Sequence, residues 1–164
     1  MDWLIILGLT AIAVVIIVIA VRKNDANMDK LVSEGRAAKR ERTFWMQQTM
    51  FSTDTSSVDK IYSAIDKTTL HEVAISHYLE AGNCVLFTNK VAGGSFAATL
   101  KVDRQNGGKQ QYTYQIDQYQ GTGGYMKPKC LRAANILLTA IEKAFLQLDK
   151  DTSVSRRTVA FQTK

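Results

Sequence analysis

The clearest β-sheet signal in the chain is the pair of segments SFAATLKVD (residues 95–103) and QYTYQIDQYQ (residues 111–120). Apolar and polar side chains alternate along both segments, which is the pattern of a strand with one buried face and one wet face. The intervening Asn106-Gly107-Gly108 is typical of a hairpin turn. The two segments therefore predict an antiparallel hairpin that needs a cover on one face.

The predicted cover is an amphipathic helix over residues 129–148, which follows Pro128 as a helix-start residue. With about 100° of rotation per residue, its apolar side chains form one arc that can lie across the sheet. This arc contains Leu131, Ala134, Leu137, Leu138, Ile141, Phe145 and Leu148. Ile136 and Leu146 fall in the opposite, polar arc, and they are therefore candidates to contact either a partner or a second element of the domain, although single exposed apolar residues are also common.

Segments upstream of the hairpin supply the rest of the predicted domain. Residues 43–51 (TFWMQQTMF) and 84–88 (CVLFT) are rich in β-favouring residues and predict two further strands. Residues 56–65 predict a short amphipathic helix, with Ser56 as its cap. Residues 69–81 begin with a capping box and favour a second short helix, but apolar and polar residues also alternate there, so a strand remains open.

These elements predict the α+β class. We expect an N-terminal single transmembrane helix, then one antiparallel sheet of about four strands packed against a long C-terminal helix and one or two shorter helices. This order is similar to helix-grip or TBP-like folds over residues 43–148. The similarity is one of architecture and implies no function, because one fold supports many functions.

Residues 3–21 (WLIILGLTAIAVVIIVIAV) predict a membrane anchor. They carry no charge, and thirteen of them are Leu, Ile or Val. As a helix they would extend about 28 Å, close to the ~30 Å of a bilayer's hydrocarbon core. We therefore expect the lipid bilayer to be a partner of residues 3–21. A cleaved signal peptide is the alternative, although such peptides carry a positive charge before the apolar run and this segment does not.

Basic residues follow the apolar segment and predict its orientation. Trp3 lies at the first end and Arg22 and Lys23 at the second, with seven basic residues in 22–42 and none before residue 3. The positive-inside rule then places the N-terminus outside and the remaining chain in the cytoplasm, as a single-pass membrane protein.

The sequence divides into four predicted regions. Residues 1–22 are a transmembrane anchor, 23–42 a juxtamembrane basic stalk that is helical with a break near Gly35, 43–148 a cytoplasmic α+β domain, and 149–164 a flexible tail. The formal net charge is +6, most of it outside 43–148. Because nucleic-acid binding needs a basic face on the folded module, this distribution argues against a nucleic-acid partner.

No motif assigns a catalytic residue, a cofactor or a metal. His71 and His77 are six residues apart, and on a helix they would point about 240° apart, so they cannot share a metal. In a reducing compartment Cys84 and Cys130 are expected to be thiols, while a disulfide between them would imply the opposite topology. Of the two, Cys130 is the better candidate nucleophile, because cationic neighbours near a helix start lower a thiol pKa.

One loop has the composition of an anion or ligand site. Gly123 and Gly124 precede Lys127 and Lys129, close to the predicted start of the last helix. The glycines match no phosphate-binding motif, so loop flexibility at a sheet edge is the favoured interpretation and an anion site the alternative.

The sequence thus favours a single-pass, membrane-anchored cytoplasmic module for protein interaction or assembly, without evident catalysis and with a protein partner of unknown identity. The alternative is a tethered small-molecule or lipid-binding domain of helix-grip-like architecture, because a helix across a curved sheet can enclose an apolar cavity.

Overall fold

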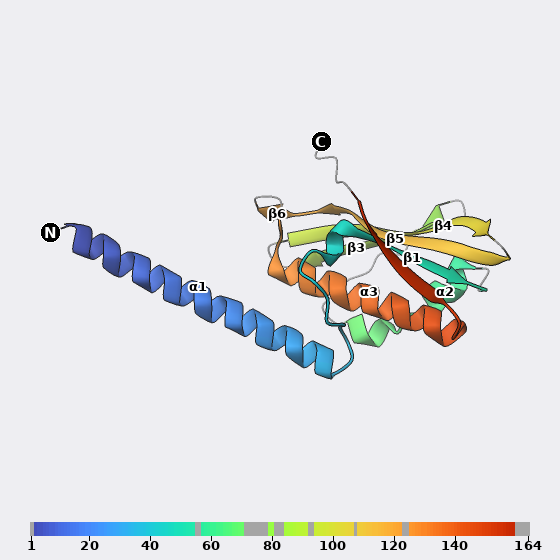
Figure 1. Ribbon diagram of the computed structural model, residues 1–164, viewed down its shortest axis with the longest axis horizontal. Helices are drawn as coiled ribbons and strands as arrows, with labels where there is room; N and C mark the ends of the chain where they lie inside the picture. The colour runs from blue at the N-terminus through green and yellow to red at the C-terminus, as the bar shows by residue number, and fades with distance from the viewer. Residues whose placement is uncertain are drawn as a thin grey trace.

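The computed structural model describes residues 2–54, 57–70, 79–80, 84–91, 94–106, 108–122 and 125–159. A long N-terminal helix projects from a domain in which helices pack beneath a β-sheet (Figure 1). The architecture is α+β with one long C-terminal helix against an antiparallel sheet, which confirms the predicted fold class.

Helix α1 spans Asp2–Ser33 and continues without a break from the predicted anchor into the predicted stalk. It ends just before Gly35, whose φ of 68° lies in the left-handed region. The amide groups of Gly35 and Arg36 donate to the carbonyl oxygens of Val32 and Leu31. This is a Schellman-type cap, in which glycine accepts a conformation that side chains disfavour.

Six described strands form one antiparallel sheet in the order β2-β3-β4-β5-β1-β8. Their bounds are β1 Gln47–Thr53, β2 Leu79–Glu80, β3 Cys84–Val91, β4 Gly94–Asn106, β5 Lys109–Tyr119 and β8 Ser153–Thr158. The predicted hairpin is confirmed as β4 and β5, and Leu100 pairs with Tyr114 on the buried face. A β-bulge interrupts this pairing between Ala97 and Ala98.

Helix α3, Pro128–Leu148, covers the inner face of the sheet as predicted (Figure 1). The rings of Phe51 on β1 and Phe145 on α3 stack with centroids 4.1 Å apart, and Tyr112 meets Phe145 edge-on at 5.2 Å. Such aromatic pairs stabilise the fold by about 0.5–1.5 kcal/mol beyond the contribution of the apolar area that they bury. The short helix α2, Val58–Ala64, and the 3-10 helix η2, Lys67–Leu70, pack against α3.

Two of the predicted upstream elements differ from the structure. Residues Phe44–Met46 form a 3-10 helix, η1, so the strand predicted over 43–51 begins only at Gln47. The favoured helix over 69–81 is wrong at its end, where Leu79–Glu80 form β2 beside β3. Residues 71–78, with His71 and His77, lie outside the described residues.

The prediction of a flexible tail over 149–164 is also wrong for its described part. Residues Ser153–Thr158 form β8, which pairs with β1 from Gln47 to Ser52. The error arises because all six side chains of β8 are exposed, so the strand has no alternation of apolar and polar residues. Pairing with β1, and not burial of side chains, holds this strand.

A second, two-stranded sheet lies at the end of the domain where α3 begins. It consists of β6, Gly121–Thr122, and β7, Tyr125–Met126. Figure 1 shows it on the side toward which the N-terminus of α1 points.

Candidate functional site

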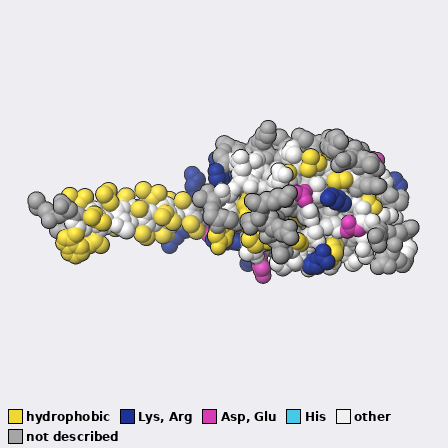
Figure 2. Space-filling model, turned by 90° about the horizontal axis from the view of Figure 1, so that it is seen from above, with side chains coloured by type: hydrophobic (Ala, Val, Ile, Leu, Met, Phe, Trp, Pro, Cys, Tyr) yellow, Lys and Arg dark blue, Asp and Glu magenta, His cyan; other side chains and the backbone are white. Residues whose placement is uncertain are grey.

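The apolar part of α1 is exposed along its whole length. The large apolar side chains described between Trp3 and Val21 are all at least 43% exposed, and none packs against the domain. Figure 2 shows this part as an apolar rod beside the domain. A helix that is apolar on all sides needs an apolar surrounding. By length and composition, α1 is therefore a candidate membrane span or signal sequence.

The last turns of α1 belong to the domain. Leu31 is buried in the core, with Met28 and Val32 packed against it, and Ala37 is buried after the helix end. The boundary that we predict at residue 43 therefore falls too late. Because the helix is continuous, its attachment at Leu31 fixes the direction of the apolar part relative to the sheet.

A cluster of polar side chains joins the segment after α1 to α3 through hydrogen bonds and an ion pair. The Arg40 side chain is only 4% exposed, and its guanidinium donates to both carboxylate oxygens of Glu142 at 3.1 and 2.5 Å. It also donates to Asn135 Oδ1 at 3.0 Å and to Thr139 Oγ1 at 3.3 Å. Arg156 on β8 donates to the same Glu142 carboxylate at 2.9 Å. We call these five residues the Arg40 cluster.

The Arg40 cluster joins three parts of the chain that are far apart in sequence. It links the segment after α1 to α3 and to β8, and Asn135 also exchanges hydrogen bonds with the backbone of Ala38. A bidentate arginine–carboxylate pair fixes geometry as well as energy. Because removal of one partner leaves a buried charge uncompensated, the cluster is well suited to hold the helix and the domain in one relative position.

Burial also affects Tyr114, on β5. Desolvation raises the pKa of its phenol well above the ordinary value, while the positive charge of Arg40 opposes this rise. Its hydroxyl has no hydrogen-bond partner among the described atoms. Tyr114 is therefore a neutral core residue and not an acid–base group.

Ile136 does not belong to a partner surface, because its side chain lies in the domain core beneath the elements that pack against α3. We predict Ile136 in a solvated arc of α3, but its side chain is fully buried. The segment from Gly35 to Arg40 lies over that arc, through contacts with Asn135, Thr139 and Lys143. Every residue from Ala133 to Ile141 is buried, because this segment, the sheet, α2 and η2 all pack against α3.

Leu146 differs from Ile136, because 45% of its side chain is exposed. The pair Glu142–Arg156 places β8 beside α3. Leu146 lies one helical turn beyond Glu142, and Val154 lies two strand residues from Arg156, both toward the turn that joins α3 to β8. Val154 is also exposed. We call Leu146, Val154 and the free edge of β8 the α3–β8 edge.

The α3–β8 edge carries backbone groups without a strand partner. β8 is the last strand in the sheet order, so among the described strands only β1 pairs with it. An exposed strand edge is a template for pairing with another chain.

Of the residues considered for chemistry, the structure describes only the two cysteines. Cys84 and Cys130 are both free thiols, half-buried and buried respectively. Burial raises the pKa of Cys130, and the opposing effect of Lys127 is smaller, so the predicted lowering of this pKa is wrong. The described part of the chain contains no group of three or more metal-binding side chains.

The predicted anion loop is only partly described. Gly123 and Gly124 lie outside the described residues, whereas Lys127 and Lys129 are exposed at the start of α3. Gly94, at the start of β4, has a packing role. A Cβ there would lie 2.5 Å from Cys130 Sγ, so glycine allows β4 to approach α3.

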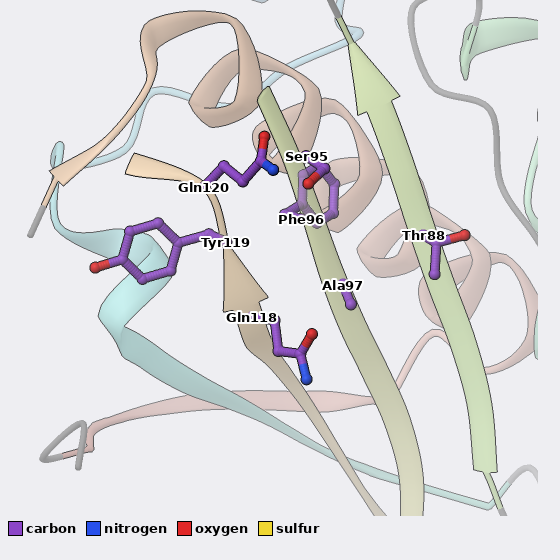
Figure 3. A pocket seen from close by; sticks show the side chains of 7 residues that line it. All are labelled: Thr88, Ser95, Phe96, Ala97, Gln118, Tyr119 and Gln120. Atoms are coloured by element: carbon purple, nitrogen blue, oxygen red, sulfur yellow. The ribbon is translucent and has the colours of Figure 1, made fainter. Parts of the chain in front are cut away.

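A groove of about 320 Å³ lies near the β-bulge at the sheet end (Figure 3). Its lining residues come from β3, β4 and the end of β5, and are Thr88, Ser95, Phe96, Ala97, Gln118, Tyr119 and Gln120. The ring of Tyr119 packs against Trp45 with centroids 4.5 Å apart. The groove is open, and the described side chains that line it are uncharged, so they offer hydroxyl and amide groups to a ligand.

Sequence reasoning misses the Arg40 cluster because its members look like solvated residues. The available signal is the spacing of Asn135, Thr139 and Glu142, which fall at i, i+4 and i+7 on the polar face of an amphipathic helix. Such a polar line can face water or a polar segment, and sequence alone does not distinguish the two.

The fold and these surfaces define an α+β domain carried by a single exposed apolar helix. Comparisons with protein-family models, curated proteins and solved structures find no match for the chain.

Proposed function

We propose that the protein is a single-pass, membrane-anchored module that binds another protein through the α3–β8 edge. The observation that carries the proposal is α1, whose apolar part is fully exposed while its last turns are buried in the domain core. A helix of this kind is stable where lipid surrounds its apolar part, and it would hold the domain beside the membrane.

Charge supports a cytoplasmic domain. Arg22 and Lys23 are exposed at the end of the apolar segment, and Lys30 and Lys39 are exposed further along. Basic residues on the cytoplasmic flank of a span set its orientation. The free thiols Cys84 and Cys130 are compatible with a reducing compartment.

Labelling with a membrane-impermeant maleimide tests anchoring and orientation together. The cells express full-length chains with Cys84→Ser, to which either Asp2→Cys or Lys150→Cys is added. We expect intact cells to label Asp2→Cys and permeabilised cells to label Lys150→Cys as well. Labelling of Lys150→Cys in intact cells would contradict the cytoplasmic placement. A mature chain without the Asp2→Cys label would indicate a cleaved signal sequence.

The protein-binding part of the proposal rests on an exposed strand edge flanked by two exposed apolar side chains, Leu146 and Val154. A partner strand could pair with β8 while its side chains cover these two residues. We expect an interaction of this type, because main-chain hydrogen bonds give affinity and the flanking side chains give specificity.

A photo-cross-linking residue at Val154 tests this surface in cells. The matched control carries the cross-linker at Lys101, an exposed residue on β4 that β5 and β1 separate from β8. We expect a discrete adduct at Val154 that is absent at Lys101 and weakened by Leu146→Asp, which changes an exposed residue. The same adducts at both positions, or none at Val154, would contradict the α3–β8 edge as a binding surface.

The alternative, a small-molecule or lipid-binding domain, is supported by the groove of about 320 Å³ near the β-bulge. This volume is at the low end for ligand sites, which measure roughly 300–1,000 Å³. The space between α3 and the sheet, where a helix-grip cavity would lie, is filled by Phe51, Tyr112 and Phe145. Native mass spectrometry of the detergent-solubilised chain distinguishes the alternatives, because a carrier retains a small molecule of constant mass.

A further inference from the structure

Exposed aromatic and basic side chains gather at the end of the domain where α3 begins. Tyr125 on β7 is 72% exposed, which is more than any other large hydrophobic side chain described in the domain. Lys127 and Lys129, immediately before and inside the first turn of α3, are also exposed. We call Tyr125, Lys127 and Lys129 the α3 start patch.

Contacts between α1 and α3 show how far the α3 start patch lies along the long helix. Asn135 Nδ2 is 3.7 Å from Met28 Sδ, and further along both elements Lys143 Nζ donates to the Gly35 carbonyl at 2.6 Å. Because both contacts advance in the same direction, α1 and α3 run side by side with their N-termini toward the same end. Figure 1 shows the two helices in this arrangement.

The register of these contacts places the start of α3 level with the end of the apolar segment. Seven residues separate Asn135 from Pro128, and seven separate Met28 from Val21. At about 1.5 Å of rise per residue, both intervals are about 10 Å. Pro128 therefore lies at about the level of Val21, and the β6–β7 sheet extends further in the same direction (Figure 1).

The same level carries other positive side chains. Arg22 and Lys23 follow Val21 directly and are exposed. Figure 2 shows Lys and Arg side chains where the apolar rod meets the domain. If residues 3–21 fill the hydrocarbon core, this level is the headgroup region of the membrane, at the end of the span opposite Trp3.

We propose that the α3 start patch rests on the membrane surface, so that the domain binds lipid through a second contact besides its span. The inference rests on the proposed anchor. Tyrosine is enriched at membrane interfaces, because its ring can lie among the upper acyl chains while its hydroxyl remains wet. Lys127 and Lys129 would then face the phosphate groups of anionic lipids. Two contacts would fix the orientation of the domain and keep the α3–β8 edge away from the bilayer.

Fluorescence quenching in lipid nanodiscs tests the lipid contact on the full-length chain. A bimane label is attached to Tyr125→Cys, to Leu146→Cys at the far end of α3, or to Ile12→Cys in the span, each with Cys84→Ser. The nanodiscs contain phosphatidylglycerol and lipids brominated near the headgroup end of the acyl chain. We expect quenching at positions 12 and 125, and none at 146.

The three positions separate this inference from the proposed anchor. Quenching at position 12 without quenching at 125 would overturn the lipid contact and leave the anchor intact. The absence of quenching at position 12 would overturn both proposals.

Charge variants test the role of the lysines. The double variant Lys127→Gln with Lys129→Gln should lower the equilibrium constant for contact between the patch and the lipid, measured at the Tyr125→Cys label, by roughly 30-fold. The reason is that each basic residue near an anionic surface strengthens binding by a similar factor. The matched control, Lys60→Gln with Lys150→Gln, removes the same charge from exposed residues outside the patch. Equal quenching in both variants, or equal quenching in neutral phosphatidylcholine nanodiscs, would overturn the electrostatic part of the proposal.

Discussion

The two long helices of this protein differ in what surrounds them. The apolar part of α1 touches nothing in the domain, whereas α3 is buried from Ala133 to Ile141 although its sequence is amphipathic. The first case shows that a helix which is apolar on all sides requires an apolar environment, and the domain does not provide one. The second shows that a polar helical face need not meet water, because the segment after α1 packs on Asn135 and Thr139.

The largest test of this comparison is truncation of Ile136. We expect Ile136→Ala to lower the free energy of unfolding of the domain by about 2–5 kcal/mol, because it leaves a cavity in a packed core. Leu146→Ala, on the exposed side of the same helix, should change it by no more than about 0.5 kcal/mol.

Denaturant unfolding of the full-length chain in detergent measures both values, with Trp45 fluorescence as the signal and Trp3→Phe to remove the other tryptophan. Trp45 is buried against Tyr119, so it reports the domain core. Similar losses in the two variants would mean that Ile136 is not buried in the domain core.

The next test concerns Arg40, in the segment that packs on the polar face of α3. We expect Arg40→Met to lower the free energy of unfolding by about 3 kcal/mol, because Glu142 keeps only the half-exposed Arg156 as a charged partner. The double variant Arg40→Met with Glu142→Leu should recover most of this loss, since an apolar pair avoids the cost of desolvating two charges.

The matched control for Arg40 is Arg42→Gln, which removes an exposed ion pair with Asp25. Surface pairs contribute about 0–1 kcal/mol, so this variant should be close to the parent in the same unfolding assay. If Arg42→Gln lowers the free energy of unfolding as much as Arg40→Met, the burial of Arg40 does not determine how much its ion pair stabilises the domain.

The smallest expected effect concerns the end of α3. Asp149 accepts hydrogen bonds from the Thr53 hydroxyl and from the backbone amides of Asp54 and Asp151, and these lower the pKa of its carboxyl to about 2. A lowered pKa stabilises the folded state fully above the ordinary value of 3.8, and this contribution is lost as the pH falls toward 2.

Carboxyl titration by NMR and thermal unfolding check this effect. Both are measured between about pH 2 and 5, the range in which carboxylates titrate. We expect Thr53→Val to raise the pKa of Asp149, because it removes the hydrogen bond with the largest effect. Asp149→Asn should reduce the loss of stability in acid. A carboxyl that titrates at its ordinary value in the parent protein would show that the Thr53 contact is absent in solution.

The hairpin β4–β5 and helix α3 were predictable because their patterns repeat over many residues, so several side chains report the same buried face. β8 and the Arg40 cluster were not predictable. The side chains of β8 are exposed on both faces, and the Arg40 side chain and Asn135 become buried only because distant segments meet.

The sequence by itself determined that residues 3–21 need an apolar surrounding and that one helix covers one face of a sheet, because hydrophobic periodicity is local. Only the tertiary structure decided which side of α3 remains exposed, and therefore that Leu146 and not Ile136 is available to a partner. The physical reason is that burial depends on every segment that packs against a residue. The elements that pack against α3 include α2, η2 and the segment from Gly35 to Arg40, which lies about a hundred positions earlier in the chain.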